Sequence, residues 1–130
     1  MQPKTKIILD TNILMIPGQY KIDIFSEIKR ICQFEFELYA IDKSMIELDR
    51  IIENGKVKDK TAAKISKQLI IQKGVKIIPS EKGHVDNIIL SLAKEDDYVV
   101  ATLDKELKRR LRTEGIRIIT LRKWKYLMFE

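Results

Sequence analysis

The sequence has little cysteine and histidine, with one residue of each in 130. A single cysteine, Cys32, excludes a disulfide within the chain and a zinc site built from several cysteines. It falls on the apolar stripe of an expected helix, so we assign it to the core. The single histidine, His84, lies in a polar stretch near Ser80 and Asp86. In such a stretch, a residue at the entrance to a helix is more common than a catalytic base.

Glycine is also scarce, and the five glycines stand apart from one another. The sequence therefore has no glycine-rich phosphate loop and no dinucleotide-binding fingerprint, which excludes nucleotide binding by those motifs. No apolar run is long enough to span a bilayer, and Lys4, Lys6 and Asp10 interrupt the N-terminal segment. We therefore expect a cytoplasmic protein with neither a membrane span nor a secretory signal.

Basic residues are in excess, with 25 Lys and Arg against 19 Asp and Glu, for a net charge of +6. The excess is concentrated near the end of the chain, because residues 105–130 contain nine basic and three acidic residues. A basic segment of this kind is compatible with a polyanionic partner such as nucleic acid. The part from Lys105 to Arg112 has helical spacing, and two interpretations stay open: a helix that guides phosphates, or an ordinary solvated face.

Short apolar segments alternate with segments of helical periodicity, which predicts an α/β fold with a parallel sheet. The length and the 45% of hydrophobic residues suit one core, so we expect a single domain over residues 1–130. Strands are expected at residues 6–9, 36–41, 75–78, 98–101 and 116–121. Helices are expected at residues 24–32, 44–54, 58–73, 84–95 and 105–112.

Two segments carry more specific expectations. Residues 11–19 contain Pro17 and Gly18 and follow neither periodicity, so they are expected to form a loop over the end of the first strand. Ser44 and Glu47 have the spacing of a capping box, which predicts that a helix begins at Ser44.

The tail, residues 122–130, interleaves aromatic and basic side chains: Arg122, Lys123, Trp124, Lys125, Tyr126 and Phe129. One interpretation is that the aromatic rings stack on nucleic acid while the basic groups clamp its backbone. The other is that the rings cover one edge of the sheet. The sequence leaves both open.

Four acids follow four successive strands: Asp10, Glu47, Asp86 and Asp104. Each has an ordinary explanation as a helix cap or a partner of a helix dipole. Capping gives no reason, however, for an acid at the same edge after every strand, whereas a cation site requires it. Because the carboxyl ends of parallel strands meet at one edge, we expect the four carboxylates to converge there.

Converging carboxylates suit a hard divalent ion such as Mg²⁺ or Mn²⁺, which takes oxygen ligands. Two such ions can activate a water and stabilise the leaving oxygen in phosphodiester hydrolysis. Asp10 stands out because an acid placed directly after a buried strand loses hydration unless a cation pairs with it. Aspartyl phosphatases of the haloacid dehalogenase kind usually carry a second acid two residues after the nucleophile, and here that residue is Asn12.

The acids and their surroundings resemble, in order and context, the PIN-domain family of metal-dependent ribonucleases. The resemblance rests on four segments: Asp10-Thr11-Asn12, Glu47 within MIELDRI, Asp86 within HVDNIILSLA, and Asp104 within VVATLDKELKRRL. It implies a three-layer α/β/α sandwich around a five-stranded parallel sheet of order 3-2-1-4-5. It also implies cleavage of single-stranded RNA with Mg²⁺ or Mn²⁺ held by the four acids. Supporting residues would be Thr11, Asn12 and Thr102, and RNA would be guided by Lys105, Lys108, Arg109 and Arg112.

Within the family, DTNILMIPGQYKIDIFSEI and LRKWKYL are similar to the branch related to the eukaryotic small-subunit processome nuclease. Members of that branch often have a further acid after the third catalytic acid, where this chain has Asn87. The resemblance implies ribosomal RNA processing, with precursor rRNA, a ribosome-assembly protein or a second copy of the chain as partners. Two alternatives stay open: a toxin of the VapC kind with an antitoxin partner, and an RNA-binding scaffold of ribosome assembly that does not cut.

Overall fold

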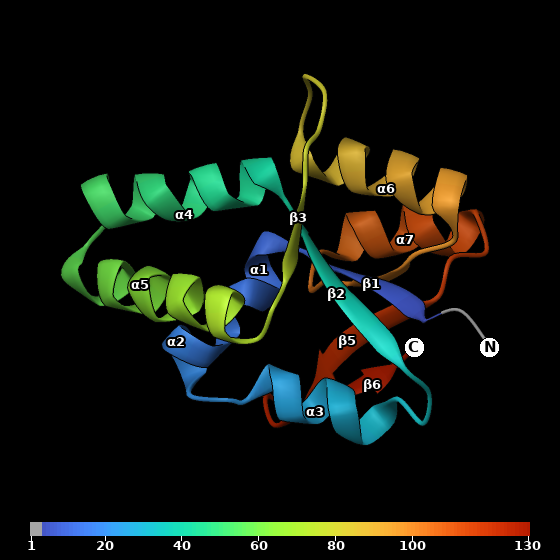
Figure 1. Cartoon of the computed structure of the whole chain (residues 1–130), viewed down its shortest axis with the longest axis horizontal. Helices are drawn as coiled ribbons and strands as arrows, with labels where there is room; N and C mark the ends of the chain where they lie inside the picture. Colours follow the sequence, from blue (N-terminus) through green and yellow to red (C-terminus); the bar gives the residue numbers. More distant parts are fainter. Residues whose placement is uncertain (1–3) are drawn as a thin grey trace.

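A mixed sheet of six strands, in the order β3-β2-β1-β4-β5-β6, forms the centre of the molecule (Figure 1). The computed structural model describes residues 4–130. The first five strands pair in parallel, and β6 pairs with β5 in antiparallel orientation. The strands are β1 (Thr5–Leu9), β2 (Phe36–Ile41), β3 (Lys76–Ile78), β4 (Val99–Ala101), β5 (Ile118–Arg122) and β6 (Tyr126–Phe129).

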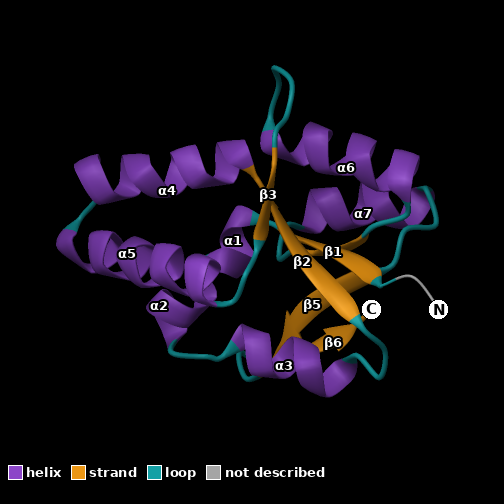
Figure 2. Cartoon of the chain, in the orientation of Figure 1, coloured by secondary structure: helices purple, strands orange, loops and turns teal. Residues whose placement is uncertain are grey.

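Helices connect the parallel strands and lie on both sides of the sheet (Figure 2). They are α1 (Thr11–Leu14), α2 (Ile16–Tyr20), α3 (Ile24–Ile31), α4 (Asp42–Asn54), α5 (Val57–Gln72), α6 (Val85–Asp96) and α7 (Lys105–Thr113). In Figure 1, α6 and α7 stack on one side of the sheet and α3 lies on the other. Among residues 4–130, no helix combines the length and apolar character needed to cross a membrane.

The central strand β1 divides the core because successive side chains of a strand point to opposite faces. Ile7 and Leu9 join the larger cluster, which includes Ile28 of α3. Ile8 joins the other, with Ile89 of α6 and buried leucines of α7. All three β1 side chains are fully buried. The predicted three-layer α/β/α arrangement and the order of the first five strands are confirmed.

The expectation of five strands was incomplete, because the tail adds β6 to the edge of the sheet. Its register pairs Leu121 with Leu127 and Thr120 with Met128. Leu127 is fully buried, and the Glu130 amide donates to the Ile118 carbonyl at 2.9 Å. The tail thus adds a strand to one edge of the sheet, and Tyr126 and Phe129 are partly buried there, whereas Trp124 is 59% exposed, so the second interpretation holds for two of the three rings.

The expectation of a loop at residues 11–19 was wrong, because this segment forms α1 and α2. The Asp10 carboxylate accepts a hydrogen bond from the Thr11 amide and caps α1. Pro17 lies in the first turn of α2. Proline has no backbone N–H, and the amides of a first turn have no hydrogen-bond partner within the helix, so it is tolerated there. Ile13 and Ile16 are fully buried, so tertiary packing stabilises two helices that are too short to form alone.

The expected capping box at Ser44 was also wrong. Helix α4 begins at Asp42, and the preceding Ile41 makes no side-chain cap. Ser44 therefore lies within the helix, where it is buried and accepts a hydrogen bond from the Thr11 hydroxyl at 2.7 Å. Because β2 passes into α4 without a loop, the helix starts earlier than the local pattern indicates.

Candidate active site

The four acids that follow the strands line one open cleft of about 480 Å³ at the carboxyl edge of the sheet. Asp10 comes directly after β1, Glu47 lies on α4, Asp86 lies in the first turn of α6, and Asp104 precedes α7. The acids are far apart in the sequence and come together because the parallel strands β3, β2, β1 and β4 are neighbours in that order. The remaining lining residues are Thr11, Asn12, Met15, Gln19, Ile51, His84 and Val85.

Asp10 is the most buried of the four acids, with 7% of its surface exposed. Its Oδ1 accepts from the Thr11 amide at 2.8 Å. Its Oδ2 accepts from the Thr102 hydroxyl at 2.7 Å and from the Asn12 amide group at 3.2 Å. Burial raises the pKa of Asp10, and the nearby charge of Asp104 acts in the same direction, while these three donors oppose the rise.

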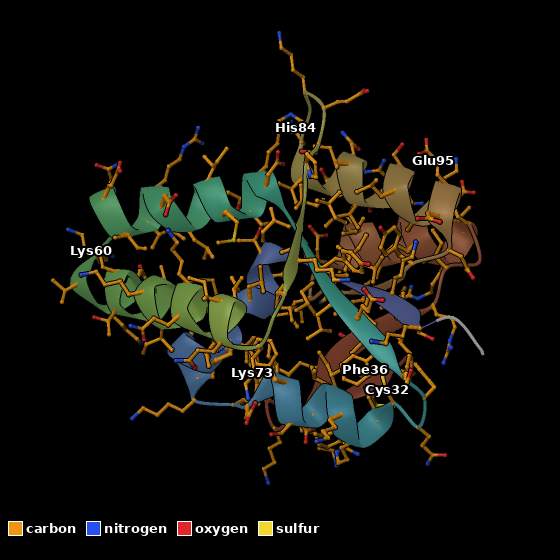
Figure 3. All side chains as sticks on the ribbon, viewed as in Figure 1. Cys32, Phe36, Lys60, Lys73, His84 and Glu95 are labelled. Atoms are coloured by element: carbon orange, nitrogen blue, oxygen red, sulfur yellow. The ribbon has the colours of Figure 1, made fainter. Side chains whose placement is uncertain are left out.

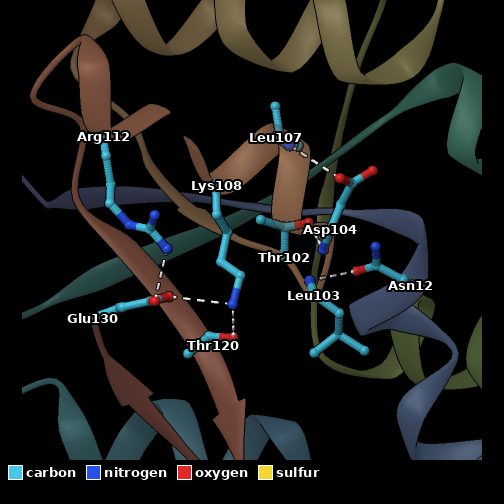
Figure 4. A network of polar contacts seen from close by, with 9 residues as sticks. All are labelled: Asn12, Thr102, Leu103, Asp104, Leu107, Lys108, Arg112, Thr120 and Glu130. Atoms are coloured by element: carbon cyan, nitrogen blue, oxygen red, sulfur yellow. Dashed lines mark hydrogen bonds and ion pairs between the residues drawn. The ribbon is translucent and has the colours of Figure 1, made fainter. Parts of the chain in front are cut away.

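A chain of hydrogen bonds connects Asp10 to the start of α7, and Figure 4 shows its part from Thr102 and Asn12 to Leu107. The Thr102 hydroxyl, which donates to Asp10, accepts from the Asp104 amide at 3.1 Å. Asn12 Oδ1 accepts from the Leu103 amide at 3.1 Å, and Asp104 Oδ1 caps α7 by accepting from the Leu107 amide at 3.0 Å. One Asp104 oxygen therefore caps α7, which leaves the other oxygen free of this bond. The bonds of Thr102 and Leu103 hold the β4–α7 turn against the segment that follows β1.

Glu47 lines the same cleft from α4. Burial raises the pKa of Glu47, and the negative charge of Asp10 adds to the increase. Arg50 and the Thr11 hydroxyl oppose the rise. Asp10 and Glu47 are therefore two partly desolvated carboxylates close enough to repel one another, an arrangement that a divalent cation would stabilise.

Asp86 is more exposed, with 42% of its side chain accessible. Its Oδ1 accepts from the Asn87 amide at 2.9 Å, and its Oδ2 lies 3.6 Å from the Arg110 guanidinium of α7. The side chain of Arg110 therefore stands next to the cleft. Asn87 lines separate depressions along α6 and is absent from the cleft lining.

The donor set fits a hard divalent cation because every candidate ligand is a carboxylate oxygen. Within residues 4–130, no three acidic, histidine or cysteine side chains are grouped closely enough to hold an ion without rearrangement. Magnesium commonly binds through one or two carboxylates, with waters and substrate phosphates completing its coordination. Asp10 and Glu47 both have raised pKa values, so a bound cation would stabilise their charged forms.

The basic residues predicted to guide RNA lie on α7, outside the lining of the cleft. Lys108 is nearly buried, contacts Glu130 at 3.3 Å and donates to Thr120, while Arg112 contacts Glu130 at 2.8 Å (Figure 4). Arg109 pairs with Glu106 on the exposed face of the helix. Lys105 forms no ion pair with any residue of the described chain. Two of the four cations thus attach the C-terminal end of β6 to α7.

Sequence reasoning missed several neighbours of the acids. His84 is at the start of α6, as expected of a helix-entry residue, but it also lines the cleft (Figure 3). Gln19 of α2 and Met15, which lies between α1 and α2, reach the cleft from the segment that was expected to be a loop. Arg110 was noted only as part of the basic segment. Its spacing from Lys105 and Arg109 gives no signal that it faces an acid on another helix.

The family is shown by comparison with known proteins. Residues 7–124 match the family described as "PIN like domain". The chain therefore belongs to the PIN-domain family, as the spacing of its acids and their surroundings indicated.

Individual relatives are similar to this chain over nearly its whole length. The chain is 34% identical over 122 residues to Ribonuclease VapC4 of Methanocaldococcus jannaschii, covering 93% of each protein. It is 28% identical over 124 residues to Ribonuclease VapC9 of Archaeoglobus fulgidus, covering 95% of this chain and 87% of the relative. Its structure is similar to that of the PIN domain endonuclease Utp24, with a TM-score of 0.80 at 26% identity, covering 99% of this chain and 93% of the other. The resemblance to the Utp24 branch is thereby confirmed.

Proposed function

We propose that the protein is an endoribonuclease that hydrolyses phosphodiester bonds of single-stranded RNA at the cleft lined by the four acids, with Mg²⁺ or Mn²⁺. The observation that carries the proposal is that acids following four successive parallel strands line a single cleft. The names of the relatives support it, because VapC4 and VapC9 are ribonucleases and Utp24 is an endonuclease.

Asp10, Glu47, Asp86 and Asp104 are the proposed ligands and catalytic residues. A bound divalent cation would activate the attacking water and stabilise charge on the phosphate. Thr102 and Asn12 hold Asp10 by hydrogen bonds at 2.7 and 3.2 Å, which orients its carboxylate toward the cleft. The Thr11 hydroxyl is fixed by Ser44 and lies beside Glu47. These groups fix Asp10 and Thr11 before the cation and RNA bind, whereas a third carboxylate must move closer to share the same ion.

The proposed substrate is precursor ribosomal RNA, supported by the similarity to the Utp24 branch. A toxin that acts on another RNA and is neutralised by an antitoxin is the second candidate, supported by the identity to two VapC ribonucleases. The two candidates share the site and its chemistry. They differ in the partner: a ribosome-assembly protein for the first, and a small antitoxin for the second.

The decisive experiment measures cleavage of an unstructured RNA and a hairpin RNA in Mn²⁺ or Mg²⁺ by wild type and Asp10→Asn, with an EDTA control. Removing the buried carboxylate should lower the metal-dependent rate by at least about 100-fold, since even outer-shell changes at metal sites cost about 10- to 100-fold. Asp59→Asn, which changes an acid in the first turn of α5 outside the cleft lining, is the matched control and should cleave normally.

Two outcomes would contradict the proposal. Full metal-dependent cleavage by Asp10→Asn would show that the cleft is not the catalytic site. RNA binding that survives EDTA, with no product in any metal, would instead identify an RNA-binding scaffold.

A further inference from the structure

Most aromatic residues of the tail are used by the fold, but Trp124 is not. Tyr126 lies beneath Arg30, and Phe129 packs near Phe34 with the Arg117 guanidinium 4.4 Å from its ring centre. Trp124 instead projects from the β5–β6 turn with 59% of its surface exposed. A large ring that stays mostly exposed stabilises the fold less than a buried ring does, and its free surface is available to bind a partner.

Trp124 contacts a second exposed ring, that of Tyr20 at the end of α2, in a tilted arrangement. The ring centres are 4.7 Å apart at an angle of 46°, and Tyr20 is 51% exposed. The two residues are 104 positions apart in the sequence. We call them the Tyr20–Trp124 pair. Each ring covers part of the other, and together they present an aromatic surface to solvent.

The backbone that presents Trp124 is strained. Lys123 and Trp124 have φ angles of 54° and 51°, and the Lys125 amide closes the turn on the Arg122 carbonyl at 3.0 Å. Turns with two positive φ angles normally contain glycine, asparagine or aspartate, because other side chains crowd the backbone. A tryptophan at such a position is unfavourable for folding alone, and strain of this kind concentrates at binding sites.

Basic residues surround the pair: Lys21, Arg122, Lys123 and Lys125. All are exposed, and none of them forms an ion pair with any residue between positions 4 and 130. Aromatic rings among free cations match single-stranded nucleic acid, in which bases stack and phosphates bind positive charge. Lysine is depleted from protein–protein interfaces, so the same surroundings argue against a protein partner.

Helix α2 connects the pair to the cleft. Met15 and Gln19, which lie at the two ends of one helical turn, line the cleft, and Tyr20 directly follows Gln19. The β5–β6 turn also follows the carboxyl end of β5, which runs parallel to β4, so the pair and the cleft lie at the same edge of the sheet, and a single strand that leaves the cleft on the side of α2 can reach the pair.

We propose that the Tyr20–Trp124 pair is a base-stacking subsite for single-stranded RNA, with Lys21, Lys123 and Lys125 binding the flanking phosphates. This proposal rests on the proposed function for the identity of the polymer. It adds a site that selects unpaired bases, because a base in a duplex has no free face to stack on the rings.

The chain offers a direct probe, since Trp124 is the only tryptophan. The first experiment titrates the full chain with an unlabelled oligouridine in EDTA and follows the tryptophan emission. Stacking should quench the emission, while a sugar-phosphate oligomer of equal length without bases should not. Labelled oligouridine would then give dissociation constants for the variants by anisotropy.

Trp124→Ala should weaken oligouridine binding about tenfold and leave binding of the abasic oligomer unchanged. Trp124→Phe should keep most of the affinity because it retains a ring. Ile71→Ala, which changes a residue with 76% exposure on α5, is the matched control and should bind like wild type. Tyr20→Ala tests the same surface if Trp124→Ala does not fold.

Unchanged emission on binding, together with unchanged affinity of Trp124→Ala and Tyr20→Ala, would overturn the subsite. A blue shift of emission with protein concentration in the absence of RNA, with unaltered RNA affinity in Trp124→Ala, would assign the pair to a contact between two copies and also overturn it. Because binding is measured without metal, quenching without any cleavage in Mn²⁺ would refute only the nuclease, and cleavage without quenching would refute only the subsite.

Discussion

At the scale of single residues, Asp10 combines a structural and a chemical role. It caps α1, yet its burial and the charge of Asp104 raise its pKa. The folded chain therefore keeps the Asp10 proton to a higher pH than the unfolded chain, in which the pKa of aspartate is about 3.9. The stability that this proton binding provides is complete below the unfolded pKa and is lost as pH rises through the folded pKa.

This linkage predicts how Asp10→Asn changes thermal stability in EDTA. The asparagine stays neutral, so the Tm of the variant relative to wild type should increase as the pH is raised from about 4 to 7. Glu47 adds to the same trend, because the substitution also removes the Asp10 charge that helps to raise the pKa of Glu47. The measurement is a thermal melt of both proteins across this pH range.

Metal provides the control for the pH experiment. Added Mn²⁺ should raise the Tm of wild type at pH 7, because a ligand of the folded state stabilises it, and should have little effect on Asp10→Asn. A Tm difference that is constant with pH would contradict the prediction that Asp10 carries an unfavourable charge in the folded state.

At the scale of elements, Gly18 sets how closely α2 approaches α5. A Cβ at this position would lie 2.5 Å from the Ala62 carbonyl oxygen and 2.6 Å from the Ala62 Cα. The facing surface of α5 is correspondingly small, with Ala62, Ala63 and Ser66 all buried. Because α2 carries Gln19 to the cleft and Tyr20 to the aromatic pair, this contact positions both.

Gly18→Ala tests that contact. Helix propensity alone predicts a gain in stability of about 1 kcal/mol, since alanine is the better helix former. The added methyl group would crowd the Ala62 backbone, and overpacking of this kind costs about 1–3 kcal/mol of stability. We expect this loss to exceed the gain. Urea unfolding measures the result, with Gln19→Ala, an exposed change on the same helix, as the control. A variant as stable as wild type would show that α2 can move away from α5 at little cost.

At the scale of the whole molecule, the net charge of +6 is less available to a ligand than the sequence indicates. Lys108 and Arg112 contact Glu130, whereas Lys105 and Arg109 lie on the exposed part of α7. The basic segment thus has two roles: Lys108 and Arg112 hold the C-terminal end through Glu130, whereas Lys105 and Arg109 are exposed and make no contact with Glu130.

The salt dependence of RNA binding should separate these tasks. Each phosphate neutralised on single-stranded RNA contributes about −0.7 to the slope of log K against log salt concentration. Lys105→Gln combined with Arg109→Gln should therefore reduce the slope by up to about 1.4. Lys108→Gln should leave the slope almost unchanged and lower the Tm. Anisotropy in EDTA between about 50 and 200 mM KCl measures this, and an equal loss of slope in Lys108→Gln would contradict the division.

The sequence pattern predicted the helices and strands in which the apolar residues of the segment are also the buried ones. The continuous apolar run before Asp10 became the central strand, and the spacing of Ile89 and Ala93 became the buried face of α6. The patterns failed where distant contacts decide the structure. Helices α1 and α2 are too short to form alone, and β6 exists because it pairs with β5.

The site was predictable to the same extent. Acids that follow parallel strands must reach the same edge, so the sequence indicated which carboxylates would line a common cleft. The Arg110 partner of Asp86 and the cleft position of Gln19 were not predictable, because each depends on how two helices pack. The roles assigned to the acids and to the basic residues remain predictions that the experiments above test.

By itself, the sequence determined the alternation of strands and helices, the order of the acids along the chain and the family to which the protein belongs, because periodicity and spacing are properties of neighbouring residues. Only the tertiary structure decided that Asp10 is buried beside Thr102, that two of the basic side chains are occupied by Glu130, and that Tyr20 meets Trp124 at the surface. These depend on which segments lie together in space, and burial and charge pairing act between whatever groups the fold brings into contact.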